Sequence, residues 1–72
     1  MIDAKKAREI AEKHKPFDNV ELGKCFDWGD CFVFDYTEEI DVEPVAIDKK
    51  TGRSIYFFPP DHFDVTPVEV KA

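Results

Sequence analysis

Glycine, histidine and long apolar runs are scarce in this 72-residue chain, which has three glycines and two histidines. It contains no glycine-rich phosphate loop, no H-E-x-x-H motif and no nucleophile elbow, so no catalytic residue can be assigned. No run approaches the roughly 20 apolar residues that a membrane span needs, and the charged first 15 residues do not resemble a secretory signal. We therefore expect a cytoplasmic protein that is not an enzyme, has no cofactor and does not bind membranes.

Basic residues are scarce in the middle of the chain. From residue 18 to residue 43, nine acidic side chains are accompanied by one base, Lys24, and the net charge of the whole chain is −6. Phosphate groups require a basic surface, so nucleic acids and anionic membranes are excluded as partners. The acidic segment indicates either simple solubility or attraction to a basic protein partner.

Aromatic residues, in contrast, are plentiful. Seven phenylalanines, two tyrosines and one tryptophan occur in a chain that is 43% hydrophobic. Each aromatic side chain buries on the order of 150–250 Å², which allows a small domain to form a core without crosslinks. We expect a single domain over residues 1–72.

The first 15 residues have the pattern of an amphipathic helix. Asp3 is placed to cap it, and Pro16 disfavours helical geometry at Lys15, so the helix should end there. The apolar stripe consists of Ala4, Ala7, Ile10, Ala11 and His14. Because this stripe is mostly alanine, the helix should lie close to a sheet that supplies the large side chains.

Two β-hairpins follow in the sequence pattern. For the first, a three-residue loop of Asp27, Trp28 and Gly29 is preferred over a four-residue loop that would pair residues 26 and 31. The preferred register pairs residues 26 with 30, 24 with 32 and 22 with 34. It places five apolar side chains on one face: Leu22, Phe26, Phe32, Phe34 and Tyr36.

The second hairpin is predicted to turn at Lys50, Thr51 and Gly52. This register sets Ile47 opposite Ile55 and Val45 opposite Phe57, with all four on one face. Residues 65–70 offer a short edge strand. The prediction is an α+β fold, in which an N-terminal helix packs on one face of an antiparallel sheet of four to five strands built from two hairpins.

The two cysteines could in principle form a redox, disulfide or metal site. The preferred register puts Cys25 directly opposite Cys31, but a disulfide there would close a very short loop in a reducing compartment. Five residues separate the cysteines, a wider spacing than zinc motifs use, and His14 and His62 have no local relation to them. We expect two free cysteines at or near the sheet surface and no metal.

Surface residues are the remaining candidates for function. Trp28 at the hairpin tip either folds back onto the sheet or forms an exposed anchor with an acidic rim. The expected partner-binding residues are Asp27, Trp28, Asp30, Glu38, Glu39, Asp41 and Glu43. Tyr56 and Phe58 point away from their neighbours Ile55 and Phe57, so either the C-terminal segment covers them or they form a homodimer or second interface.

Three segments resemble a known family. AREIAEKH, the aromatic run GDCFVFDY and PVAIDKKTGRS are similar to the Immunity protein 35 family of small bacterial proteins, over roughly residues 7–55. The segment from Pro44 to Gly52 is the most specific part, although a strand followed by D-K-x-T-G also occurs in PepSY-like domains. The chain departs from the family pattern because Asp30 or Cys31 stands where the family has a tryptophan.

The resemblance implies a non-enzymatic inhibitor that binds and silences a toxin encoded beside it. Many such toxins are basic nucleases, and an acidic inhibitor would associate with them quickly and in a salt-dependent way. The alternative is a structural or self-associating small domain that uses the Tyr56 and Phe58 face for a homodimer.

Overall fold

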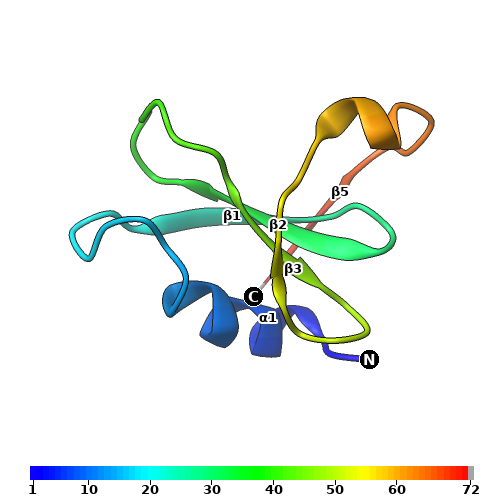
Figure 1. Cartoon of the computed structure of the whole chain (residues 1–72), viewed down its shortest axis with the longest axis horizontal. Helices are drawn as coiled ribbons and strands as arrows, with labels where there is room; N and C mark the ends of the chain where they lie inside the picture. Colours follow the sequence, from blue (N-terminus) through cyan, green and yellow to red (C-terminus); the bar gives the residue numbers. More distant parts are fainter. Residues whose placement is uncertain (72) are drawn as a thin grey trace.

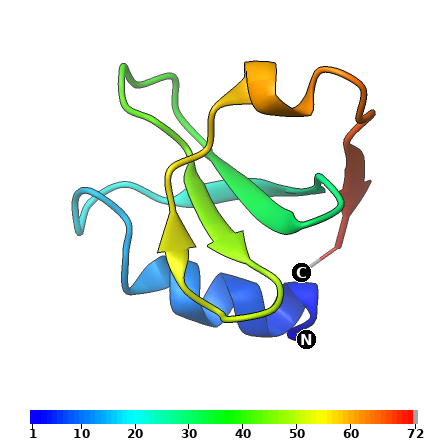
Figure 2. The ribbon, with the colours of Figure 1, turned by 45° about the vertical axis from the view of Figure 1, so that its right-hand side comes forward.

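The computed structural model describes residues 1–71, apart from the side chain of residue 61. One helix packs on one face of a five-stranded antiparallel sheet with strand order β4-β3-β2-β1-β5 (Figures 1 and 2), which confirms the predicted α+β fold. The elements are α1 (Ala4–Glu12), β1 (Leu22–Asp27), β2 (Cys31–Tyr36), β3 (Val45–Asp48), β4 (Ser54–Ile55), the 3-10 helix η1 (Pro59–His62) and β5 (Val68–Val70).

Helix α1 begins as its sequence predicts. The carboxylate of Asp3 accepts a hydrogen bond from the backbone N–H of Lys6 at 2.8 Å, which satisfies one of the unpaired amides of the first turn. The helix ends at Glu12, three residues earlier than predicted. Ala7 and Ala11 are fully buried against the sheet, so the helix backbone can approach the strands closely.

The main core lies between α1 and the sheet. Large side chains come from the strands, as the alanine stripe predicts, and Phe34 and Ile47 are among the largest that are fully buried. Its buried members are Ala7, Ala11, Leu22, Cys25, Phe32, Phe34, Val45 and Ile47. No helix in the described part of the chain is long and apolar enough to cross a membrane.

The first hairpin turns more tightly than either predicted register allows. The N–H of Trp28 donates to the carbonyl oxygen of Cys31 at 3.0 Å, which leaves Gly29 and Asp30 as a two-residue loop. Gly29 has a φ of +96°, a conformation that other residues rarely adopt. The three-residue loop and its four-residue alternative are therefore both wrong.

A β-bulge in β1 changes which face its later residues occupy. Leu22 pairs with Tyr36, but Cys25 pairs with Phe34, so β1 advances three residues while β2 advances two. The extra residue turns Cys25 toward the helix and Phe26 toward the opposite face. The prediction that Phe26 shares a face with Leu22 is wrong for this reason, although Leu22, Phe32, Phe34 and Tyr36 do share one.

The second hairpin has a four-residue loop, residues 49–52, and its register differs by one residue from the prediction. Ala46 pairs with Ile55, so Ile55 lies on the face opposite to Ile47. Gly52 does take a positive φ, +72°, at the end of the loop. A one-residue shift moves every side chain of the strand to the other face, which is why the predicted pairs of Ile47 with Ile55 and Val45 with Phe57 are both wrong.

A smaller apolar cluster covers the second face of the sheet. Cys31, Val33, Ala46 and Phe57 are buried there, and the partly buried Trp28 packs against them. Cys31 and Cys25 thus lie on opposite faces of the sheet, both buried and both free. The predictions that they face each other and lie near the surface are wrong, because the two-residue loop and the bulge change the register.

The C-terminal residues form the predicted edge strand. β5 pairs antiparallel with β1, with Cys25 opposite Val70 and Asp27 opposite Val68. Between β4 and β5, η1 lies on the side of the sheet away from α1 (Figure 2). This route brings His62 to the tip of the first hairpin, where its ring contacts Trp28.

Candidate functional site

The acidic connection between β2 and β3 forms one end of the molecule. Its start is joined to the segment before β1 by a hydrogen bond from the N–H of Thr37 to the carbonyl oxygen of Glu21, at 3.0 Å. Its end is held by the hydroxyl of Tyr36, which donates to the carbonyl oxygen of Glu43 at 2.6 Å. Six exposed acids belong to these two segments: Asp18, Glu21, Glu38, Glu39, Asp41 and Glu43. We call them the acidic end.

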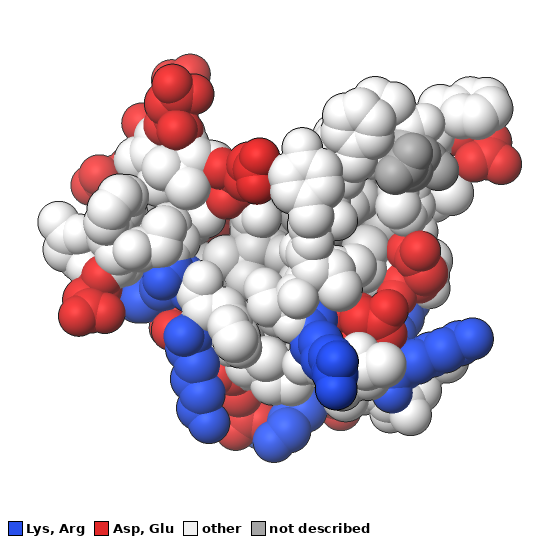
Figure 3. All heavy atoms as spheres, viewed as in Figure 1, with Lys and Arg blue, Asp and Glu red and all other residues white. Residues whose placement is uncertain are grey.

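Acidic groups gather at one end of the face that Figure 3 shows. The red groups at the upper left lie where Figure 1 places the connection between β2 and β3, while most blue groups lie along the side formed by α1 and the β3–β4 loop, with some red groups among them. On this face, a positively charged surface would therefore be attracted most strongly to the end that carries the connection.

The structure divides the predicted partner-binding residues into two groups. Glu38, Glu39, Asp41 and Glu43 lie beyond the last residue of β2, whereas Asp27, Trp28 and Asp30 lie around its first residue. A six-residue strand separates the groups by roughly 20 Å at about 3.3 Å per residue. They do not form one surface patch.

Trp28 folds back onto the second face of the sheet. Its ring centroid lies 4.8 Å from that of Phe57 and 6.0 Å from that of His62. The side chain is half-buried rather than exposed as an isolated anchor. Of the two interpretations of Trp28, the structure supports the packed one, and its predicted role in partner binding stays a prediction.

Lys49 joins the tips of the two hairpins. Its ammonium group lies 2.6 Å from the carboxylate of Asp27 and 4.8 Å from the ring centroid of Phe32, and its backbone N–H donates to the carbonyl oxygen of Asp30. The hydrogen bond from Lys49 lowers the pKa of Asp27 below its ordinary value, and the backbone N–H of Gly29 lowers it further against the opposing effect of burial.

This lowered pKa predicts a specific acid sensitivity. A carboxyl group whose pKa is lower in the folded than in the unfolded state stabilises the fold above the unfolded value of about 3.9. That stabilisation is lost as the pH falls through the folded value. In urea titrations between about pH 6 and pH 2.5, we expect Asp27→Asn to show a weaker loss of stability with acid than the wild type.

The Lys49→Met variant provides the control for this prediction. It removes the hydrogen-bonding cation and leaves Asp27 in place, so its acid dependence should also weaken. The acid dependence of stability should weaken no more in the double variant than in either single variant, because both changes remove the same interaction between Asp27 and Lys49. Full acid dependence in Asp27→Asn would show that other carboxyl groups are responsible.

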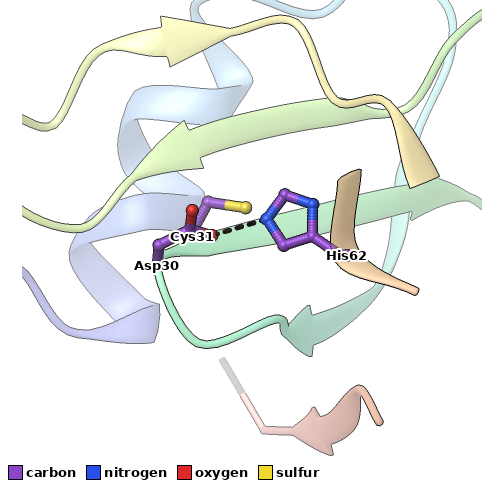
Figure 4. A group of neighbouring side chains, drawn as sticks. All are labelled: Asp30, Cys31 and His62. Atoms are coloured by element: carbon purple, nitrogen blue, oxygen red, sulfur yellow. Dashed lines mark hydrogen bonds and ion pairs between the residues drawn. The ribbon is translucent and has the colours of Figure 1, made fainter. Parts of the chain in front are cut away.

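A mixed cluster of side chains meets at the tip of the first hairpin. Figure 4 shows Asp30, from the loop of the first hairpin, and Cys31, the first residue of β2, directed toward the imidazole of His62 at the end of η1. Nε2 of His62 lies 3.0 Å from Oδ1 of Asp30, and one potential ligand atom from each residue lies within 4.8 Å of the other two. Cys31 is fully buried, the His62 side chain is 18% exposed and that of Asp30 is 68% exposed.

The protonation of this cluster does not suit nucleophilic catalysis. Burial raises the pKa of the Cys31 thiol to about 12, and its hydrogen bond to Asp30 acts in the same direction. Burial would raise the pKa of Asp30 too, but hydrogen bonds from His62 and Cys31 hold it below its ordinary value. Burial likewise raises the pKa of Cys25 to about 11. Attack requires a thiolate, so neither thiol is an activated nucleophile at neutral pH.

Tyr56 and Phe58 form an exposed aromatic pair beyond β4. The Tyr56 side chain is 67% exposed and that of Phe58 is 45% exposed, and their rings are stacked with centroids 6.3 Å apart. The C-terminal segment therefore does not cover them. Their predicted role in a homodimer or second interface stays a prediction.

The D-K-x-T-G segment has a clear structural role. The carboxylate of Asp48 accepts hydrogen bonds from the N–H groups of Lys50 and Thr51, at 2.8 and 3.0 Å, and Gly52 supplies the positive φ that closes the loop. These residues therefore build the turn of the second hairpin. The part of the sequence most similar to the Immunity protein 35 family is explained by folding without a functional role.

No family model, curated protein or solved structure matches this chain. The resemblance to the Immunity protein 35 family thus stays a prediction carried by the quoted residues.

Proposed function

We propose that this protein is a small, non-catalytic, cytoplasmic binding protein whose acidic end engages a basic protein partner. The single observation that carries the proposal is the concentration of six exposed acids on two segments that Thr37 joins by a hydrogen bond to Glu21, while Tyr36 holds the end of the acidic connection at Glu43. The hydrogen bonds fix the direction of the acidic connection, so less conformational freedom would be lost when a partner binds.

A surface depression beside the acidic end supports this proposal. It has a volume of about 200 Å³ and lies between the end of the helical segment and the β3–β4 edge. Its lining includes His14, Pro16, Tyr36, Val42, Glu43 and Ile55. A lysine or arginine of a partner could place its aliphatic part on Val42 and Ile55 and its charge near Glu43.

The family resemblance suggests what kind of partner the acidic end binds and what binding does. It suggests that the partner is a toxin encoded beside this protein and that binding inhibits the toxin. An acidic inhibitor of a basic toxin would gain its association rate from charge attraction, so complex formation should slow as the salt concentration rises.

Pull-down from the native cell lysate tests the proposal, with tagged protein and elution in rising salt. We compare wild type with Glu38→Lys/Glu39→Lys, which reverses two charges of the acidic end. The matched control, Glu9→Lys/Asp64→Lys, makes the same change in net charge at exposed sites away from that end. We expect a stoichiometric basic partner that salt releases, that the control retains and that the acidic-end variant loses.

Two results would contradict the proposal: equal loss of the partner in both variants, or equal retention in both. Recovery of this protein alone would favour the second candidate, a self-associating domain. The observation behind that candidate is the exposed pair Tyr56 and Phe58 beside the edge strand β4. Sedimentation at micromolar concentration decides it, because a monomer of 8.3 kDa excludes a tight homodimer.

A further inference from the structure

We propose that Asp30, Cys31 and His62 form a binding site for a divalent transition-metal ion of the Zn²⁺ type. One carboxylate oxygen, one thiol sulfur and one imidazole nitrogen meet there, within 4.8 Å of one another (Figure 4). This site lies at the end of β2 away from the acidic end, so the inference is independent of the proposed function.

The type of donor selects the class of ion. A sulfur and an imidazole nitrogen favour Zn²⁺, Co²⁺ or Cu over Mg²⁺ and Ca²⁺, which prefer oxygen ligands. Zinc lies about 2.3 Å from sulfur and about 2.0–2.1 Å from nitrogen, so ligand atoms of a tetrahedral site are roughly 3.5 Å apart. Asp30 and His62 are already at 3.0 Å, and the Cys31 sulfur, which lies within 4.8 Å of both donor atoms, would have to move closer to complete the set.

The three donor atoms converge on one place instead of forming a chain of hydrogen bonds through the imidazole of His62. In a relay, the two ring nitrogens of histidine would contact different partners. Here Nε2 of His62 contacts Asp30, and among the described residues Nδ1 has no hydrogen-bond partner. Figure 4 shows the Cys31 sulfur beside the same edge of the ring that faces Asp30.

Metal binding would change the contacts and the protonation of the three donor side chains. Without an ion, Nε2 of His62 lies 3.0 Å from Oδ1 of Asp30, and the Cys31 sulfur lies within 4.8 Å of both atoms. On binding, the metal takes the thiolate of Cys31 and the thiol proton leaves to solvent, while neutral His62 donates a lone pair. The exposed side of Asp30 leaves a fourth position for water, which is the arrangement of an open three-ligand site.

Binding would tie η1 to the start of β2. Asp30 and His62 are 32 residues apart in sequence, and the contacts of His62 with this hairpin tip include its pair with Asp30 and its ring contact with Trp28. An ion that binds only the folded chain stabilises it, because the unfolded chain does not hold the three donors together.

Titration of the metal-stripped protein with Co²⁺ tests the site. We expect one equivalent to give an intense near-ultraviolet absorption band from a thiolate–Co²⁺ bond, and to quench the emission of Trp28, whose ring lies 6.0 Å from that of His62. Added Zn²⁺ should remove the band by displacement. His62→Gln should weaken binding by at least about 10- to 100-fold, because losing a direct ligand should cost no less than losing a group that supports one.

The two cysteines provide a matched pair of variants. Cys31→Ser should abolish the band, whereas Cys25→Ser should leave it unchanged, because Cys25 is buried on the opposite face under the helix. Circular dichroism checks that each variant folds. If Cys31→Ser does not fold, Asp30→Asn, at an exposed position, is used instead and should weaken Co²⁺ binding rather than remove the thiolate. Absence of the band in the wild type would overturn the site. So would a band that survives in Cys31→Ser, or Co²⁺ affinity that His62→Gln leaves unchanged.

Discussion

Replacing Phe34 by alanine should lower the free energy of unfolding by about 3–5 kcal/mol. Phe34 is fully buried at the middle of β2, the central strand, and lies opposite Cys25 on one side and Val45 on the other. The guanidinium group of Arg8 lies 5.4 Å from its ring centroid. Truncation would therefore leave a cavity where helix and sheet meet, and neither Ala7 nor Ala11 is large enough to fill it.

The expected loss is large relative to the total stability. At about 0.05–0.15 kcal/mol per residue, a chain of this length has only about 4–11 kcal/mol to lose. Urea unfolding followed by Trp28 fluorescence and by circular dichroism measures the change. Phe63→Ala is the matched control, because that side chain is 88% exposed and its removal should change stability by no more than about 0.5 kcal/mol. Equal effects of the two variants would contradict the described core.

The sequence was sufficient to predict the helix, the strands and the packing of the helix on the sheet, but not the strand order, η1 or the registers. The alternation of apolar side chains in β2 and the alanine stripe of α1 predict a helix packed on a sheet. Both patterns follow directly from the repeat of side-chain directions in a strand and in a helix. The register depends on loop geometry, and a Gly-Asp loop with a positive φ at Gly29 competes with longer loops of similar composition. The bulge in β1 has no signal besides Gly23, because a glycine inside a strand can mark a bulge but can also mark a tight bend or the close approach of another backbone.

The sites were predictable to different degrees. The acidic connection is continuous in sequence, so its charge could be recognised without knowledge of the fold. The cluster of Asp30, Cys31 and His62 could not, because His62 reaches the hairpin tip only through the path of η1 across the second face. The sequence instead linked Cys31 to Cys25, and that link depended on a register that the chain does not adopt.

Gly23→Ala should destabilise the protein by about 1–3 kcal/mol through steric overlap at the bulge. A Cβ atom there would overlap Oδ1 of Asp35 and would lie 3.1 Å from the carbonyl carbon of Tyr36. Moving the Asp35 side chain away would break the hydrogen bond that the same oxygen accepts from the N–H of Lys24. The cost arises from this contact and not from the backbone angle of Gly23.

A double-mutant cycle with Asp35→Ala distinguishes this cause from a general effect of losing a glycine. Asp35→Ala should recover part of the stability that Gly23→Ala loses, since it removes the overlapping oxygen. It should recover nothing in Gly29→Ala, where a Cβ has open space and the cost of about 1 kcal/mol comes from the positive φ. A measurable coupling free energy of Asp35→Ala with Gly23→Ala, but not with Gly29→Ala, would show that the bulge packs against Asp35. Zero coupling would mean that the strands do not meet there, and the burial of Cys25 in the core, which depends on the bulge, would then need another explanation.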